Sequence, residues 1–360
     1  MKRTESQNIA LIKKLSDAFG PPGFEDDVVE ICAHELKDIA TVIEDKIRNL
    51  HIDGNNNTGD KPVVWLDAHS DEVGFIIQAI NPNGTIHFLP LGGWDPGNVP
   101  SNRLKIKNDK GEFITGVVAS KPPHFMTEAE KGAKSLDAMR IDCGPLSAEE
   151  LAENMAVGIG NPIIPDVTCE YNKKSKTFLG KAFDCRIGVA ALLETFNQAH
   201  QIKDLPVDLI GTVSSQEEVG TRGILAASQV TDADVAIVFE GAPADDNFQP
   251  DYMVQAGLKK GPSLRYFDST MVTNPKLMKF AKEVAEKYEI PIQLTVRSGG
   301  GTNARVIHTT QWGIPTIVIG IPVRYIHSQN GFVAYEDYEN AVKLAVSIIR
   351  ELSEEVVENL

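Results

Sequence analysis

Histidine and carboxylate side chains gather in five short segments of the chain. In chain order, these segments hold His69 with Asp71, Asp184, Glu217 with Glu218, Glu240, and His327. Each segment lies at the carboxyl end of a predicted strand or in the loop just after it, and the segment with Asp184 also opens a predicted helix. Ligands of open α/β sheets bind at this edge. The five segments therefore predict one shared site.

The types of these side chains indicate a metal site. Histidine is a common metal ligand, and the nearby carboxylate in His69-Ser70-Asp71 can fix its tautomer and ring orientation. Adjacent Glu217 and Glu218 resist joint ionisation unless a cation neutralises them. One can then bind the metal while the other handles a proton. Two histidines with several carboxylates suit zinc or a similar borderline metal, and a two-metal site activates water and polarises a carbonyl.

Each signal is weak when taken alone, because a single His-x-Asp or a Glu-Glu pair is common at protein surfaces. Asp184, before a predicted helix, can be a plain N-cap. Cys185 can act as a soft ligand, but its neighbours are mostly hard, so we expect it to support the ligands rather than bind. The remaining histidines have no partner that the sequence names; they are His34, His51, His87, His124, His200 and His308. The joint occurrence of the five segments at successive strand ends favours the metal site.

Alternating strands and helices carry most of these segments. After about Phe178 the apolar runs predict strands at Val207–Val213, Asp234–Phe239, Ile292–Val296 and Thr316–Ile321. Helices are predicted at Arg186–His200, Arg222–Gln229, Pro275–Tyr288 and Asp337–Leu352. This alternation is typical of an α/β layer with a largely parallel sheet. Two N-terminal helices and a strand at Val63–Asp67 are expected to join it.

The segment from Gly74 to Lys173 has a different, β-rich texture. Short β-like runs lie at Phe75–Ile80, Thr85–Leu89, Arg103–Ile106 and Ile114–Val118, separated by Gly- and Asn-rich turns. The polar stretch Lys121–Ser135 predicts a long loop. We therefore expect an α/β catalytic domain, residues 1–73 plus 174–360, whose mixed, mostly parallel sheet is flanked by helices. A small all-β, barrel-like domain, residues 74–173, is inserted into it.

Composition excludes several classes of protein. The 360 residues carry 35 Lys and Arg against 50 Asp and Glu, a formal net charge of −15, which argues against nucleic acid and anionic membranes as partners. No run approaches the roughly 20 apolar residues of a membrane span, and the N-terminus lacks the pattern of a secretory signal. Four scattered cysteines do not form a disulfide framework. We expect a cytoplasmic protein.

The ordered landmarks resemble a known family, the tetrahedral, glutamyl and deblocking aminopeptidases. This is metallopeptidase family forty-two, in the di-zinc aminopeptidase clan. The resemblance runs from Gly20-Pro21-Pro22-Gly23 to about Glu336. Its landmarks are Asp67-Ala68-His69-Ser70-Asp71-Glu72, Leu91-Gly92-Gly93-Trp94, Gly180-Lys181-Ala182-Phe183-Asp184, Gln216-Glu217-Glu218-Val219-Gly220, Gly299-Gly300-Gly301-Thr302 and Ile321-Pro322-Val323-Arg324-Tyr325-Ile326-His327-Ser328. Their order over most of the chain makes the match specific.

The resemblance implies a role for each candidate residue. His69 and Glu240 would bind one metal ion, Glu218 and His327 the other, and Asp184 would bridge the two. Glu217 would be the general base, and Asp71 would orient His69. The implied cofactor is a pair of divalent ions per subunit, with Zn²⁺ first and Co²⁺ or Mn²⁺ as alternatives. The implied substrates are peptides with a free N-terminus. The β-rich insertion would serve dimerisation, and the dimers would build a twelve-subunit assembly.

Three positions depart from the family pattern. Cys185 stands where Asp or Asn usually follows the bridging Asp, Glu240 stands where Asp is commoner, and Asn303 replaces a usual Asp after Gly-Gly-Thr. None of them removes a metal ligand or the base. They bear on metal choice, affinity and substrate preference, since polar groups around the ligands tune a metal site.

The leading hypothesis is a metal-dependent aminopeptidase. One alternative is a deacylase or other amidohydrolase on the same two-metal core. A glucanase fits less well, because glycosidases use two carboxylates and would leave His69 and His327 idle. A degenerate, non-catalytic scaffold is the non-enzyme alternative, and metal content would separate it from the others.

Overall fold

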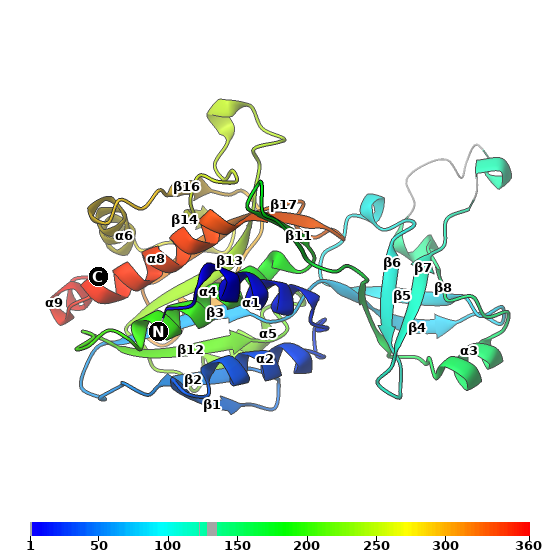
Figure 1. The fold of residues 1–360 in the computed structure, drawn as a ribbon, viewed down its shortest axis with the longest axis horizontal. Helices are drawn as coiled ribbons and strands as arrows, with labels where there is room; N and C mark the ends of the chain where they lie inside the picture. The colour runs from blue at the N-terminus through cyan, green and yellow to red at the C-terminus, as the bar shows by residue number, and fades with distance from the viewer. Residues whose placement is uncertain (1, 122, 128–134) are drawn as a thin grey trace.

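A large mixed sheet forms the centre of the computed structural model, which describes residues 2–121, 123–127 and 135–360 (Figure 1). Its strands are β1 (Ala40–Glu44), β2 (Leu50–Gly54), β3 (Val63–His69), β10 (Glu170–Asn172), β11 (Thr177–Gly180), β12 (Asp208–Ser214), β13 (Val235–Pro243), β14 (Ser263–Asp268), β15 (Met271–Val272), β16 (Gln293–Val296), β17 (Thr316–Arg324) and β18 (Gly331–Ala334). The main path of the sheet runs β1-β2-β12-β3-β13-β17-β18-β11-β10.

Along its main path, only the centre of this sheet is parallel, and off that path β14 also pairs with β16 in parallel. Strands β12, β3, β13 and β17 pair in parallel, whereas β1, β2, β18, β11 and β10 extend both flanks by antiparallel pairing. The expectation of a mostly parallel sheet is therefore wrong for the flanks. Several flanking strands are short and joined as hairpins, such as β10 with β11, so they lack the long apolar runs that mark the central strands.

The two faces of the central strands bury side chains against different helices. In β13, Val235, Ile237 and Phe239 enter one core, while Ala236 and Val238 enter the other. This alternation follows from the two-residue period of a strand. Helices α1, α2, α4, α6 and α8 cover the first face, and α5 and α7 cover the second. The larger body is thus a three-layer α/β structure, as the alternating pattern predicts.

The helices of the described residues are α1 (Glu5–Asp17), α2 (Asp26–Leu36), α3 (Ala148–Met155), α4 (Phe183–Ala199), α5 (Arg222–Ala227), α6 (Pro275–Lys287), α7 (Ala304–Ile307), α8 (Tyr335–Glu351) and α9 (Glu354–Glu358). Helices α1, α2, α4, α5, α6 and α8 lie close to predicted helices, where the apolar periodicity is strong. Helix α3 lies within the inserted segment 74–173, so the expectation that this segment is all-β is wrong there. Helix α1 begins with a capping box between Thr4 and Gln7, which satisfies two free backbone donors. No helix in the described part of the chain combines the length and apolar character needed to cross a membrane.

A closed barrel lies beside the large body (Figure 1). Its strands, in the order β4-β5-β8-β7-β6-β9, are β4 (Gly74–Ile80), β5 (Ile86–Leu91), β6 (Arg103–Lys107), β7 (Phe113–Val118), β8 (Ile141–Asp142) and β9 (Pro162–Pro165). The barrel has its own core, in which Trp94 stacks on Phe75. The loop expected at Lys121–Ser135 falls in part on residues 122 and 128–134, outside the described ones, and η2 (Pro123–Phe125) lies within the rest.

The parallel strands direct their carboxyl ends to one edge of the sheet. Strand β3 ends at His69, which is paired with Ser214 at the end of the neighbouring β12. The loop that holds Glu217 and Glu218 follows Ser214 directly. The central strands therefore bring segments that are far apart in sequence to a single place.

Candidate metal centre

His69 presents its Nε2 atom to the centre of the site. Its Nδ1 lies 3.1 Å from the main-chain oxygen of Asp71, and a carbonyl can only accept, so Nδ1 carries the proton that is donated. Once Nε2 gives up any proton it carries, its lone pair is directed at the centre of the site, where it can bind a metal. Nε2 lies 3.0 Å from Oδ1 of Asp184 and 3.5 Å from Oε1 of Glu240.

His327 is arranged in the same way on the opposite side. Its Nδ1 lies 2.9 Å from the main-chain oxygen of Gly93, so this ring also donates through Nδ1 and turns Nε2 inward. Nε2 lies 3.1 Å from Oδ2 of Asp184 and 3.5 Å from Oε2 of Glu218. Each carboxylate oxygen of Asp184 thus faces the Nε2 of a different histidine.

The loop around Gly93 comes from the barrel segment, and its glycines allow a close approach to the site. A Cβ atom on Gly92 would lie 3.1 Å from Cβ of Glu218, and one on Gly93 would lie 3.1 Å from Nδ1 of His327. The Leu91-Gly92-Gly93-Trp94 landmark therefore has a structural explanation. The barrel contributes directly to the orientation of His327, which the sequence analysis did not predict.

Asp184 lies at the start of α4, with backbone angles that depart from the helix. Its side chain makes no helix cap, so the interpretation as a plain N-cap is wrong. Burial works to raise its pKa, but the contacts with His327 and His69 outweigh this and lower the pKa below its usual range. The Asp184 carboxylate is ionised and lies between the two histidines.

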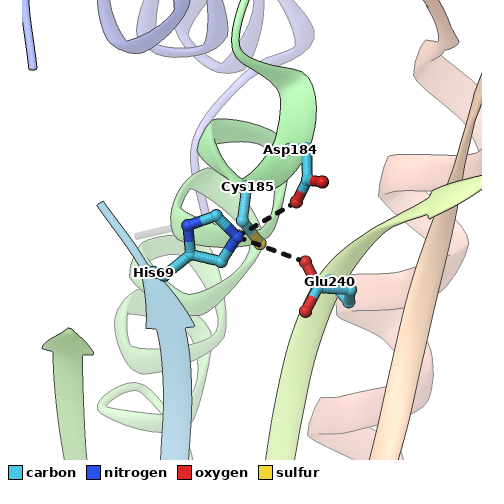
Figure 2. A group of neighbouring side chains, drawn as sticks. All are labelled: His69, Asp184, Cys185 and Glu240. Atoms are coloured by element: carbon cyan, nitrogen blue, oxygen red, sulfur yellow. Dashed lines mark hydrogen bonds and ion pairs between the residues drawn. The ribbon is translucent and has the colours of Figure 1, made fainter. Parts of the chain in front are cut away.

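Cys185 and Glu240 complete the first group of candidate ligands (Figure 2). One ligand atom from each of His69, Asp184, Cys185 and Glu240 lies within 4.8 Å of all the others. Strand β13 continues beyond its predicted end at Phe239, so Glu240 lies within the strand and not in the loop after it. Glu240 is paired with Gly320 of β17. Asp184, Glu218 and His327 form a second group by the same criterion, so Asp184 belongs to both.

Asp71 fixes the loop that carries the two glutamates. Its Oδ1 and Oδ2 atoms accept hydrogen bonds from the backbone amides of Glu217 (2.9 Å) and Glu218 (3.0 Å). Oδ1 also lies 3.4 Å from Nδ1 of His69. The same carboxylate thus contacts the ring of one candidate ligand and the loop that carries the others.

Several buried carboxyl groups crowd the site. Burial, and then the neighbouring charge of Asp184, raise the pKa of Glu218 to about 8 and also raise the pKa of Glu240. The pKa of Glu217 is raised well above its usual range, mainly by burial and then by the charge of Glu218. Oε1 of Glu218 is a buried oxygen without a hydrogen-bond partner among the described residues. Divalent cations would satisfy all of these groups, so the residues present fit a metal pair.

Buried cations hold the loops around the site in place. Arg186, 1% exposed, donates from Nε to the carbonyl of Ser70 (2.5 Å) and from Nη2 to that of Gly20 (3.1 Å). Lys181 pairs with both carboxylate oxygens of Glu72 at 2.7 and 2.8 Å. A Cβ atom on Gly20 would lie 2.8 Å from Nη2 of Arg186, which explains the glycine. The sequence analysis assigned no role to Arg186, Lys181 or Glu72.

A cleft of about 430 Å³ opens onto the candidate ligands. Glu217 lines it together with Asp184, Glu218, Glu240 and His327. Two arginines that the sequence analysis did not predict, Arg265 and Arg297, line it as well, and each is paired with an aspartate, Asp268 and Asp245 respectively. Arg265 lies on β14, which was not predicted as a strand.

The other histidines do not join the site. Neither group of candidate ligands includes any of them, and His51, His87 and His308 pair with Asp45, Asn81 and the main-chain oxygen of Ala304 respectively. Asn303 is one of the three positions that depart from the family pattern. Its Nδ2 donates to Oδ2 of Asp67 at 2.8 Å and to Oγ of Ser214 at 2.7 Å.

Comparison with known proteins finds similarity to aminopeptidases over nearly the whole chain. The model of the M42 glutamyl aminopeptidase family matches residues 49–344. The TET aminopeptidase of the marine sediment archaeon Thaumarchaeota archaeon SCGC AB-539-E09 is 37% identical, with a TM-score of 0.93 over 98% of this chain and 99% of that one. The lysyl aminopeptidase of Pyrococcus furiosus is 34% identical over 95% of this chain and 96% of its own. The TET1 peptidase of Pyrococcus horikoshii is 27% identical, with a TM-score of 0.84 over 96% of this chain and 100% of that one.

The fold, the site and these relatives define a metal-dependent aminopeptidase, a hydrolase that acts as an exopeptidase. Within that class, the chain belongs to the M42 glutamyl aminopeptidase family. The resemblance drawn from the sequence landmarks is therefore confirmed.

Proposed function

We propose that this aminopeptidase holds two divalent ions at the carboxyl edge of its sheet. His69 and Glu240 would hold one ion, Glu218 and His327 would hold the other, and Asp184 would be shared between them. The observation that carries this assignment is the position of Asp184, whose two carboxylate oxygens face Nε2 of His69 at 3.0 Å and Nε2 of His327 at 3.1 Å. Mixed nitrogen and oxygen donors suit Zn²⁺ best, with Co²⁺ and Mn²⁺ as alternatives.

Glu217 is the general base in this proposal. When bound, the ion pair supplies Lewis acidity that lowers the pKa of a water and polarises the peptide carbonyl. Glu217, in the wall of the cleft, accepts a proton from the attacking water. It later donates that proton to the nitrogen of the leaving amine as the C–N bond breaks. Asp71 is the positioning residue, since it holds both the Glu217 loop and the His69 ring.

The proposed substrates are peptides with a free N-terminus. Family membership supports an exopeptidase, and the four carboxylates among the residues that line the cleft favour an α-ammonium group over a carboxylate. A peptide ladder tests this directly. Mass spectrometry of an unblocked peptide over time should show loss of one N-terminal residue after another, while its N-acetylated form stays intact. Internal cleavage, or release of the acetyl group, would instead support the endopeptidase or deacylase alternative.

We further propose that the barrel mediates dimerisation and that dimers build a twelve-subunit assembly in the cytoplasm. The P. horikoshii TET1 relative assembles into a tetrahedron or a large octahedral shell. All four cysteines, each in the described part of the chain, carry free thiols, in keeping with a reducing compartment.

The barrel can be removed with little disturbance to the sheet. Its first and last strands, β4 and β9, are paired, and Phe75 lies opposite Ile163. The two ends of the barrel segment are therefore close together, and a short Gly-Ser linker can replace residues 75–164. Sedimentation velocity should then show smaller particles than those of the full chain. An assembly of unchanged subunit number would contradict a role for the barrel in dimerisation.

A further inference from the structure

Cys185 occupies a place among the candidate ligands that the proposed roles leave unexplained. Its side chain is fully buried and points into the same space as Nε2 of His69 and the carboxylate of Glu240 (Figure 2). Ligands bound to one zinc ion at about 2.0–2.3 Å stand roughly 3.3–3.8 Å apart in a tetrahedron. Nε2 of His69 lies 3.0 Å from Asp184 and 3.5 Å from Glu240, and the four ligand atoms, with the sulfur of Cys185, lie within 4.8 Å of one another, so small side-chain movements would bring them to that spacing.

The surroundings of the sulfur leave room for it and hold it in this direction. Its thiol donates to the main-chain oxygen of Phe239 at 3.2 Å, on the strand that carries Glu240. A Cβ atom on residue 188, one turn further along α4, would lie 2.4 Å from Sγ, so glycine at this position keeps the space open. Cys185 packs in the main core cluster, and its thiol is held there beside the other donors.

We propose that Cys185 is a metal ligand, so that the first ion is held by four protein side chains, His69, Asp184, Glu240 and Cys185. This rests on the proposed two-metal function. On binding, the thiol proton passes to solvent, the hydrogen bond to Phe239 is given up and a sulfur–metal bond forms, with no electron transferred. The second ion has three protein ligands, Asp184, Glu218 and His327, and so keeps an open position for substrate.

The first ion has four protein ligands and the second has three, so we expect the chain to retain the first ion more strongly. A thiolate selects soft and borderline ions such as Zn²⁺ and Co²⁺ over Mn²⁺ or Mg²⁺. The first position is therefore selective for Zn²⁺ and Co²⁺ and retains its ion, while the second exchanges. Stepwise chelation of the wild-type enzyme should leave one ion per chain.

Cobalt spectroscopy tests the ligation without depending on turnover. The metal-free chain is loaded with two equivalents of Co²⁺, and the near-ultraviolet sulfur-to-cobalt charge-transfer band is recorded. The band should appear in the wild type and in the control Cys169→Ser, whose thiol is also buried but lies in neither ligand group. Cys185→Ser should lose the band and bind its tighter ion about ten- to a hundred-fold more weakly.

Absence of the band from the doubly loaded wild type, or its persistence in Cys185→Ser, would overturn the proposal. Absence of the band from the wild-type spectrum overturns the proposal even if the variant folds poorly. Peptide hydrolysis measured in the same samples separates this inference from the proposed function. Hydrolysis without the band overturns the cysteine ligation alone, whereas the band without hydrolysis supports ligation and contradicts the proposed function.

Discussion

Asp71 accepts a hydrogen bond from the backbone amide of Glu217 at 2.9 Å, and this contact links the proposed general base to the candidate ligand His69. The same Asp71 oxygen lies 3.4 Å from Nδ1 of His69. A change at Asp71 should therefore disturb both a ligand and the base, although Asp71 itself is not directed at the metal.

Asp71→Asn tests this coupling. Asparagine replaces one carboxylate oxygen with an NH₂ group, which cannot accept a hydrogen bond. One of the two backbone N–H groups, of Glu217 or Glu218, then loses its acceptor, so the loop should shift. We expect metal affinity and kcat each to fall by about ten- to a hundred-fold, with a smaller change in KM. Metal titration and steady-state kinetics measure these values, with the exposed Asp251→Asn as control. A normal kcat with normal metal affinity would show that Asp71 has no positioning role.

Glu217→Gln separates proton transfer from metal binding. The variant keeps the size of the side chain but has no carboxylate to accept a proton, so kcat should fall by about 10²–10⁴-fold. Metal content, measured by elemental analysis, should remain that of the wild type. The exposed Glu283→Gln on α6 is the matched control. A nearly normal rate in Glu217→Gln would assign the base to another residue.

His327→Ala should remove one of the two ions. His327 belongs only to the group with Asp184 and Glu218, so its loss leaves the group around His69 complete. Elemental analysis should give about half the metal per chain found in the wild type, together with loss of turnover. His308→Ala serves as the control, because that ring only donates to the main-chain oxygen of Ala304. Unchanged metal content in His327→Ala would remove His327 from the site.

Metal affinity should increase with pH. Burial lowers the pKa of His327, but the hydrogen bond to Asp184 and the charges of Glu218 and Asp184 together outweigh it and raise the pKa to about 10. The pKa of Glu218 is raised to about 8. Both groups are protonated at pH 7 without metal and must lose their protons to bind it, so the metal-free chain carries more protons than the loaded one.

Calorimetric titration in buffers of different ionisation enthalpy measures this proton release. Zn²⁺ binding at pH 7 should release protons, and the apparent affinity should rise as the pH approaches 8 and then 10. His327→Ala should release fewer protons than the wild type. Binding at pH 7 without proton release would contradict the protonation of these two groups.

The part of the site that the sequence predicted is the part that lies at strand ends. Glu217 and Glu218 follow an apolar run that forms β12, and His69 ends the run that forms β3, so their convergence follows from parallel pairing alone. Their roles as ligands and base came from the family landmarks and remain predictions. The central strands and the long helices were likewise marked by clear hydrophobic periods.

The parts that were missed depend on contacts between distant segments. The carbonyl of Gly93 orients His327 only because a barrel loop packs against the α/β body, and no local pattern signals that. Arg186 reads as an ordinary charged residue in a helix until its guanidinium group is seen to donate to the carbonyls of Ser70, Leu15 and Gly20, which lie far away in the sequence. Flanking strands such as β10 are too short to show a period.

The most direct test of the central claim is hydrolysis of aminoacyl-p-nitroanilides by the metal-free chain as Zn²⁺ or Co²⁺ is added in measured equivalents. A two-metal aminopeptidase should be inactive after chelation, reach full activity only when the second ion is bound, and never cleave the N-acetylated substrates. The preferred N-terminal residue would be read from the same panel. Full activity in the chelated chain, or equal cleavage of the acetylated substrates, would contradict the account.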